Sequence, residues 1–455
     1  MNTKVKWILI TLGTVALVAI AAAIGFRLTS QAAASAPADQ TGPFKVGFVS
    51  NTYDDSSRSD AAGGPRPIQT YIWYPAAAEN DGDTLPPAVY DLGLPGLPPF
   101  SSMDFEAYGV DPAYQEVAAS KEGPFPLVVL SPGGGTLPLF YVHIGARLAS
   151  HGFVVAVPYN YGEGALGEPV QDADGLQHAI RIYIDRARDI QYLMTRLVAD
   201  SNESDNLLSG TVQADQIAVS GHSVGGLAAL ALAGGNDLTC NLAGLDPNLS
   251  PPELCVPILP DPRIKAIVPL DPAGLSNNLH YAELARIKIP SMLMGREWNT
   301  VVESGAANEE LLLARPHSAI QGRPNYRVEF ANYQHMSFSS TCSCMSVLRE
   351  LNGDQATDAS LAVYCPKEPV PTDETGNLVT RYMIAFLKTV LVGEKGYREM
   401  LTPGYALENE PFVEFFDTEE GSPGETVEEG YFGYFKHQSD TERATALKDP
   451  PMPVP

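Results

Sequence analysis

The chain has 455 residues, of which 44% are hydrophobic and 18% charged, a composition typical of globular proteins with a sizeable core. Its 54 acidic residues outnumber 29 basic ones and give a formal net charge of −25. An acidic excess of this size repels phosphate backbones and anionic lipid headgroups, so it argues against nucleic acid as a partner and against electrostatic binding to membranes.

The N-terminus carries an export or anchoring signal rather than part of the fold. Lys4 and Lys6 precede the uncharged stretch Trp7–Phe26, and the small residues Ala32 and Ala34 offer a cleavage site. An uncharged stretch of this length also suffices to span a bilayer, with the lysines held on the cytoplasmic side. A cleaved secretion signal and a retained membrane anchor therefore both stay open. Either one predicts that the bulk of the chain is exported.

The first strands are expected at Phe44–Val49 and Ile68–Pro75, which are rich in aromatic and β-branched residues. The proline- and glycine-rich segment Ala76–Phe125 predicts loops. Beyond it strands alternate with helices: strands are expected at Pro126–Ser131, Phe153–Pro158, Gln216–Ser220, Ile264–Leu270, Ile289–Gly295 and Tyr326–Ala331, and helices at Tyr141–Ser150, Gln177–Val198, Val224–Ala233 and Leu378–Leu391. This alternation predicts an α/β fold with a mostly parallel central sheet and helices on both faces.

Ser223 lies in the sequence Gly221-His222-Ser223-Val224-Gly225, between an expected strand and an expected helix. This is the context of a nucleophile elbow, where a serine occupies a sharp turn and its neighbours must be small. The turn also directs the amide of Val224 towards a substrate oxygen at a helix N-terminus. The alternative is a glycine-rich bend with a buried serine. Such a bend does not require a strand before it and a helix after it, so this context favours the nucleophile elbow.

A serine nucleophile needs a base and an acid that orients the base. His335 follows the last expected strand and is the candidate base. The other downstream histidines, His280, His317 and His437, are expected at the surface, and His222 is expected to serve packing. For the acid, Asp271 ends the strand Ile264–Leu270 and Glu297 follows the strand Ile289–Gly295, so both are candidates.

A second oxyanion donor is expected from Ser131–Gly135, called here the glycine loop, which follows the strand Pro126–Ser131. Its glycines allow backbone amides to turn towards a bound carbonyl. The loop lacks the lysine and the spacing of a phosphate-binding loop, so nucleotide binding is not expected.

Cysteine usage fits an oxidising compartment. We expect a disulfide between Cys240 and Cys255, and another between Cys365 and either Cys342 or Cys344. No histidine stands at ligand spacing from these cysteines, so they do not predict a metal site.

Several of these motifs resemble platelet-activating factor acetylhydrolases and their dienelactone-hydrolase-like bacterial relatives. The resemblance rests on "RPIQTYIWYPA", "PLVVLSPGGG", "YVHIGARLASHGFVVAVP", "SGHSVGG", "IKAIVPLDPAG" and "YQHMSF", in that order within Phe44–Tyr397. It implies an α/β-hydrolase fold with Ser223 as nucleophile, Asp271 as acid, His335 as base, and the amides of Gly134 and Val224 as oxyanion donors. The acid of this family sits one strand earlier than in most α/β-hydrolases, which favours Asp271 over Glu297.

The resemblance implies a serine esterase that cleaves lipid or short-acyl esters through an acyl-enzyme, without cofactor or metal. Pro132 stands where relatives usually have histidine, and the segment after Gly235 is longer than in relatives. The resemblance therefore predicts the type of reaction more closely than it predicts the substrate. A secreted polyesterase or cutinase-like hydrolase is an alternative. A hydrolase-fold binding protein without activity is another, although such proteins generally lose the nucleophile or the base.

The sequence divides into an N-terminal signal or anchor with linker (1–40), a catalytic domain (41–400) and an acidic, aromatic C-terminal segment (401–455). The proline-rich insert 235–260 is expected near the mouth of the site, where it would influence which substrates enter. Acidic tails that stay disordered usually lack aromatic residues, so the C-terminal segment is expected to pack partly on the domain.

Overall fold

The computed structural model describes residues 37–60, 63–78, 85–91, 99–163, 175–235, 258–272, 281–296, 313–331, 333–352 and 372–418. Its centre is a ten-stranded sheet in the order β12-β11-β10-β9-β8-β6-β7-β2-β1-β5, and β3 and β4 form a separate two-stranded sheet. The six neighbouring strands from β11 to β7 are parallel, while β12, β2 and β1 each join the sheet antiparallel to a neighbour.

The strands are β1 (Val46–Ser59), β2 (Pro65–Pro75), β3 (Val89–Tyr90), β4 (Phe100–Ser101), β5 (Ala113–Gln115), β6 (Phe125–Ser131), β7 (Val154–Pro158), β8 (Val212–His222), β9 (Ile264–Leu270), β10 (Ser291–Arg296), β11 (Asn325–Phe330) and β12 (Val413–Asp417). The α-helices are α2 (Val142–Ser150), α3 (Gly175–Asn202), α4 (Val224–Leu230), α7 (Tyr281–Leu284), α9 (Ala314–Ala319), α10 (Thr341–Asn352), α12 (Thr372–Leu387) and α13 (Pro403–Asn409). Short 3₁₀ segments include η2 (Ser102–Tyr108) and η6 (His335–Phe338).

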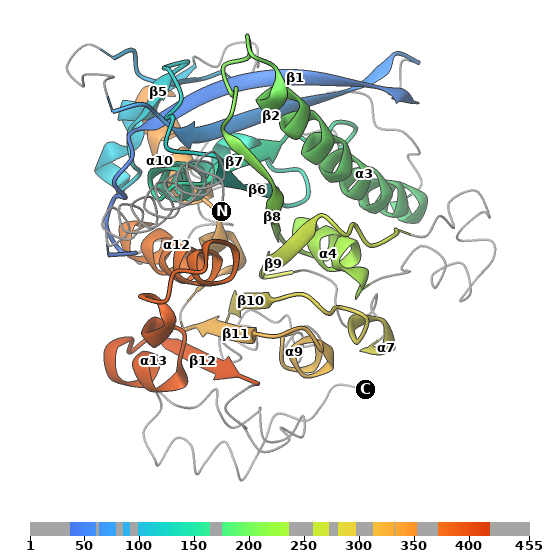
Figure 1. Cartoon of the computed structure of the whole chain (residues 1–455), viewed down its shortest axis with the longest axis vertical. Helices are drawn as coiled ribbons and strands as arrows, with labels where there is room; N and C mark the ends of the chain where they lie inside the picture. Colours follow the sequence, from blue (N-terminus) through green and yellow to red (C-terminus); the bar gives the residue numbers. More distant parts are fainter. Residues whose placement is uncertain are drawn as a thin grey trace, which may run out of the picture.

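Helices cover both faces of the sheet, as the alternating pattern predicts (Figure 1). On one face, α2 and α12 bury side chains such as Ile144 and Phe386 in a core that also contains Trp73. On the other face, α3 and α4 contribute side chains such as Ile190 and Leu227 to a second core. The parallel strands β6 and β7 are buried along their whole length, which explains their uninterrupted apolar sequences.

The prediction of loops over Ala76–Phe125 is wrong in part. Within it, β3, β4 and β5 form short pairings, and η2 begins at a capping box made by Ser101 and Asp104. These elements are too short for their periodicity to stand out among many prolines and glycines.

The beginning of the segment 401–455 is integrated into the sheet. α13 is followed by β12, which pairs antiparallel with β11 from Val413 to Asp417. The sheet therefore extends beyond residue 400, and residues 419–455 lie outside the described part of the chain.

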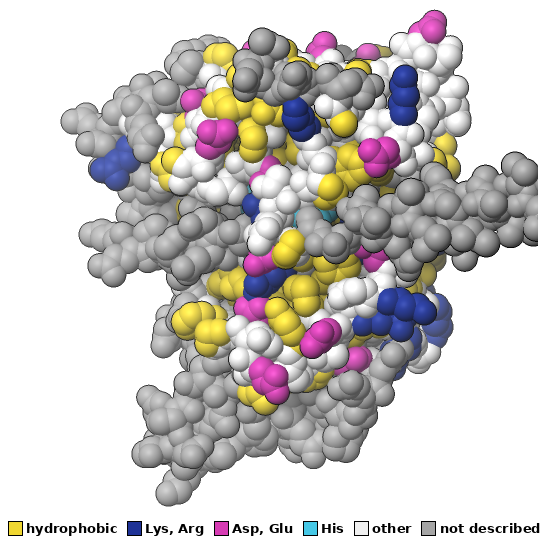
Figure 2. Space-filling view, turned by 60° about the vertical axis from the view of Figure 1, so that its left-hand side comes forward, with side chains coloured by type: hydrophobic (Ala, Val, Ile, Leu, Met, Phe, Trp, Pro, Cys, Tyr) yellow, Lys and Arg dark blue, Asp and Glu magenta, His cyan; other side chains and the backbone are white. Residues whose placement is uncertain are grey.

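In the described part of the chain, which begins at residue 37, no helix combines the length and apolarity needed to cross a membrane. The candidate span Trp7–Phe26 lies outside the described residues. On the face drawn in Figure 2, acidic side chains are scattered among hydrophobic ones rather than gathered in one patch.

Candidate active site

Ser223 stands at the junction of β8 and α4 with φ 56° and ψ −121°, a conformation that side-chain-bearing residues rarely adopt. The glycines around it are required by close backbone contacts. A Cβ atom on Gly221 would lie 2.2 Å from the carbonyl oxygen of Gly225, and one on Gly225 would lie 2.1 Å from that of Ser131. The sequence therefore folds as the strand–turn–helix that the motif predicts.

The ends of three neighbouring strands meet at this turn. The Ser223 amide donates to the carbonyl of Leu270 over 2.9 Å, and the amide of Asp271 donates to the carbonyl of Met294 over 2.7 Å. Asp271, which has φ 37°, thus follows β9 directly beside the elbow. The carboxyl ends of parallel strands in open α/β sheets are where ligands bind, so this edge is the candidate active site.

His335 and Asp271 form a direct pair. Nδ1 of His335 lies 2.5 Å from Oδ2 of Asp271, which leaves Nε2 of the imidazole available for a proton from a nucleophile. His335 is the first residue of η6, and its side chain is 35% exposed, whereas that of Asp271 is 10% exposed. The buried carboxylate thus holds a histidine that substrate can reach.

Arg296 is a site residue that the sequence analysis missed. Its Nε donates to the same Oδ2 of Asp271 over 2.7 Å. Burial raises the pKa of Asp271, but the hydrogen bond and charge of His335 and the charge of Arg296 outweigh it and lower that pKa to about 2. Arg296 ends β10, next to β9, so only the strand order reveals that it reaches this carboxylate.

His222 does more than pack. Its Nε2 lies 2.9 Å from the carbonyl oxygen of His335, and its Nδ1 lies 2.9 Å from the hydroxyl of Tyr141. A carbonyl can only accept, so Nε2 of His222 carries the proton and Nδ1 accepts from Tyr141. Burial lowers the pKa of His222 to about 3, with a further lowering from His335, so its imidazole stays neutral.

The same Tyr141 hydroxyl accepts a hydrogen bond from the amide of Gly133 over 2.7 Å. A hydrogen-bonded chain therefore runs from the glycine loop through Tyr141 and His222 to the backbone of His335, whose imidazole is held by Asp271.

The two residues whose amides are expected to bind an oxyanion, Gly134 and Val224, are neighbours in space. A Cβ on Gly134 would have Cγ2 of Val224 as its neighbour, at 3.5 Å. Val224 is the first residue of α4, where the amide has no acceptor within the helix. For the amide of Gly134, no acceptor exists among the residues that the structure describes.

The Ser223 hydroxyl likewise has no hydrogen-bond partner in the described part of the chain. Catalytic hydrogen bonds of free enzymes often tighten only when substrate binds. His335 lies close to the residue that precedes Ser223, because the rings of His222 and His335 are 4.6 Å apart between centroids.

The remaining candidate acid and the other histidines considered in the sequence are not among the described residues of the site. Glu297, the alternative acid, lies outside the described residues, as do His280 and His437. The expectation of a surface position for His317 is wrong: this residue is 2% exposed, and its Nε2 is hydrogen-bonded to the carbonyl of Asn325. Its sequence neighbours gave no sign of this burial because α9 is short.

The cysteines are partly described. Cys342 is disulfide-bonded, whereas Cys344 is a free thiol buried in the core. Of the two cysteines that the sequence left open as disulfide partners, Cys342 is therefore the one that forms a disulfide. Burial raises the pKa of the Cys344 thiol, which makes it unreactive. Cys240, Cys255 and Cys365 lie outside the described residues, as does most of the insert 235–260. Among described residues, no cluster of histidine, cysteine and acidic side chains could hold a metal ion.

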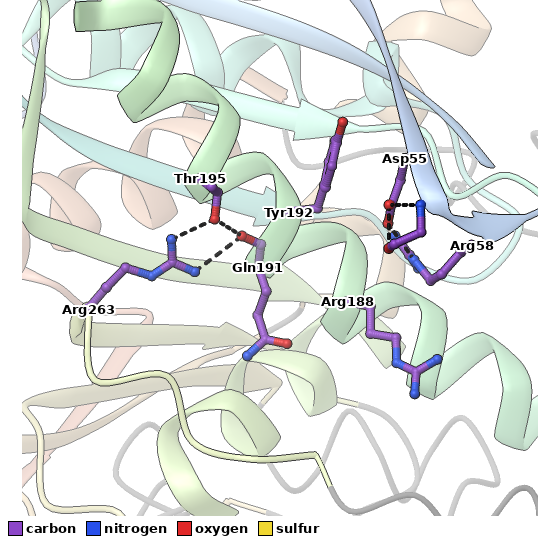
Figure 3. A pocket seen from close by; sticks show the side chains of 8 residues that line it. Asp55, Arg58, Arg188, Gln191, Tyr192, Thr195 and Arg263 are labelled. Carbon is purple, nitrogen blue, oxygen red and sulfur yellow. Dashed lines mark hydrogen bonds and ion pairs between the residues drawn. The ribbon is translucent and has the colours of Figure 1, made fainter. Parts of the chain in front are cut away.

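A pocket of about 500 Å³ lies elsewhere, between β1, α3 and the segment before β9 (Figure 3). Its lining includes Arg263, which precedes β9 and therefore lies at the opposite end of that strand from Asp271. Arg58 and Arg263 are paired there with Asp55 and Asp261. Because it lies at the opposite end of β9 from Asp271, this pocket is not part of the candidate site.

Comparisons with known proteins agree with the geometry. The family model of platelet-activating factor acetylhydrolase, isoform II, matches residues 29–184. Among solved structures, a ferulic acid esterase from Streptomyces cinnamoneus is similar, with a TM-score of 0.52 and 19% identity over 85% of this chain and 98% of that one. No curated protein matches the chain in sequence. The family resemblance is thus confirmed over residues 29–184 and supports carboxylic ester hydrolase as the enzyme class. The similarity to the solved structure confirms the α/β-hydrolase fold.

Proposed function

We propose that this carboxylic ester hydrolase acts on lipid or short-acyl esters through an acyl-enzyme on Ser223. The observation that carries the proposal is the backbone of Ser223, which is held at positive φ between β8 and α4 although this conformation is unfavourable for serine. Such strain is maintained where a side chain must be presented, and the His335–Asp271 pair lies at the same edge of the sheet.

In the proposed mechanism, Nε2 of His335 removes the proton of the Ser223 hydroxyl while the oxygen attacks the ester carbonyl. Asp271 holds the imidazole in the required tautomer and stabilises its charged form. The amides of Gly134 and Val224 bind the oxyanion, and the loss of one such donor typically costs a factor of about 10²–10³ in turnover. His335 then protonates the leaving alcohol, and water releases the acyl group by the same route.

We further propose that the chain is exported, as a secreted or membrane-anchored protein. The charged and uncharged pattern of residues 1–40 supports this, and so does the disulfide of Cys342. The insert 235–260 remains a candidate for control of substrate entry. Deleting it should change the preference between long and short acyl chains, whereas an unchanged preference would contradict that role.

The test compares wild type with Ser223→Ala on a panel of esters: p-nitrophenyl acetate, butyrate and decanoate, an acetylated and an oxidised phospholipid, methyl ferulate, and a polyester film. We expect hydrolysis of short-acyl or phospholipid esters, with less than a hundredth of it left in the variant. Preference for the film would favour a polyesterase, and preference for ferulate would favour the activity named for the structural neighbour. Absence of hydrolysis throughout would leave the binding-protein alternative.

A further inference from the structure

The glycine amides of the glycine loop have defined hydrogen-bond acceptors, with one exception that bears on the site. The amide of Gly133 donates to Tyr141, and that of Gly135 donates to Oε2 of Glu163 over 2.9 Å. Only the amide of Gly134, between them, has no acceptor within the described part of the chain. The hydrogen bonds on either side therefore leave this one amide available to a ligand.

Arg186 of α3 fixes the carbonyl groups of the same loop. One of its terminal nitrogens donates to the carbonyl oxygen of Pro132, and the other donates to that of Gly133 over 3.0 Å. The second nitrogen also donates to Oε2 of Glu163 over 2.6 Å. A guanidinium can make these bonds together because its donors form a rigid planar fork, which a lysine ammonium cannot reproduce.

The pair is deeply buried, with side chains that are 1% exposed for Arg186 and 6% exposed for Glu163. Charges are costly to remove from water, and buried pairs often add little to stability compared with apolar residues of similar volume. A purely structural account therefore gives little reason for ionic groups here, whereas the specific orientation of three consecutive peptide groups requires donors and an acceptor at these positions.

We propose that Arg186 and Glu163 are positioning residues for catalysis. They hold the carbonyls of Pro132 and Gly133 and the amide of Gly135 away from the substrate, so that the amide of Gly134 faces the developing oxyanion. This inference rests on the proposed esterase function, because it assigns a role in that reaction. Arg186 lies on α3 and Glu163 lies in the turn after β7, so both are far in sequence from Ser223.

The experiment compares wild type with Arg186→Met, with Arg186→Met/Glu163→Met, and with Arg186→Lys. The double variant removes both charges at once, so it folds without an unpaired buried carboxylate. We expect kcat for a p-nitrophenyl ester to fall about 10- to 100-fold in all three, because a displaced donor weakens transition-state binding. KM should stay within about twofold, and the inhibition constant of a trifluoromethyl ketone should rise in parallel with the loss in kcat.

Arg188→Gln is the matched control. Arg188 lies on the same helix, is exposed, and has no partner among the described residues, so this variant should match wild type. Hydrogen–deuterium exchange of the peptide 131–137 supplies a readout that does not depend on activity. We expect faster exchange in the double variant than in wild type, because the amide of Gly135 loses its acceptor.

Unchanged exchange, or a kcat within twofold of wild type in the folded double variant, would overturn the inference. The inference would also be overturned if KM rose as much as kcat fell while the inhibition constant of the ketone stayed unchanged. If wild type hydrolyses no ester, the proposed function fails by that result alone, and the exchange measurement still decides whether Arg186 and Glu163 hold the loop.

Discussion

The imidazole of His222 donates a hydrogen bond to the backbone carbonyl of His335 across 2.9 Å. The residue next to the proposed nucleophile thus supports the backbone of the proposed base, while its other nitrogen is tied to Tyr141 and through it to the glycine loop. Gly133 and His335, which lie about 200 residues apart in sequence, are thus joined through two side chains, those of Tyr141 and His222.

The first prediction concerns this bridge. His222→Phe should fold, because the ring already packs near Phe338, but kcat/KM should fall about tenfold as the base loses its support. His222→Gln can donate to the His335 carbonyl and accept from Tyr141, so it should recover part of the activity. Steady-state kinetics on one soluble ester decides the matter, and equal activity of all three proteins would refute a positioning role.

The second prediction concerns the acid. Asp271→Asn should lose about 10⁴ in turnover, because an amide stabilises the wrong tautomer of the base. Glu297→Gln is the matched control and should be only mildly impaired. Measured on the same ester, the reverse ranking would show that the chain uses the more common acid position.

The third prediction concerns Arg296 and acid stability. The pKa of Asp271 is lowered to about 2, so its ionisation stabilises the fold above the usual carboxyl pKa of about 4, and this contribution is lost as pH falls towards 2. Arg296→Gln removes one cation beside this carboxylate, which leaves His335 as its direct partner and His222 nearby. We therefore expect the acid-unfolding midpoint, followed by circular dichroism, to move to higher pH than in wild type.

Arg188→Gln is the control for that shift, since it removes an equal charge from the surface of α3. Acid-unfolding curves that coincide for wild type and Arg296→Gln would contradict the proposed electrostatic support of Asp271.

The fourth prediction concerns the close packing of the elbow. In Gly225→Ala the new Cβ would lie 2.1 Å from the carbonyl of Ser131, so strand β6 or helix α4 must shift. We expect a lower Tm and strongly reduced activity. Gly404→Ala adds a methyl group where no atom lies within 4 Å, and its Tm should be unchanged or slightly higher. Similar Tm values for both variants would argue against a packing requirement at Gly225.

Much of the fold could be predicted because the central strands are buried on both faces. The apolar sequences of β6 and β7, the sequence of β9, which is apolar except for the exposed Lys265, and the apolar spacing of α3 indicate their structure without tertiary information. β12 was not predicted, because an antiparallel edge strand of five residues is specified more by its pairing with β11 than by its own sequence.

In the candidate site, Ser223, Asp271 and His335 could be selected because each follows a strand of a recognisable pattern. Arg296, Arg186 and Glu163 could not, because their roles depend on which strands and helices are neighbours in space. The role of His222 was also hidden, since the direction of a side chain at the elbow follows from the backbone geometry of the turn rather than from residue type.

Covalent trapping tests the central claim most directly. Wild type, Ser223→Ala and His335→Ala are incubated with a fluorophosphonate, and the modified residue is identified by peptide mass spectrometry. The account predicts one label per wild-type molecule, on the peptide containing Ser223, no label in Ser223→Ala and much slower labelling in His335→Ala. Labelling of another residue, or equal labelling of wild type and Ser223→Ala, would contradict it.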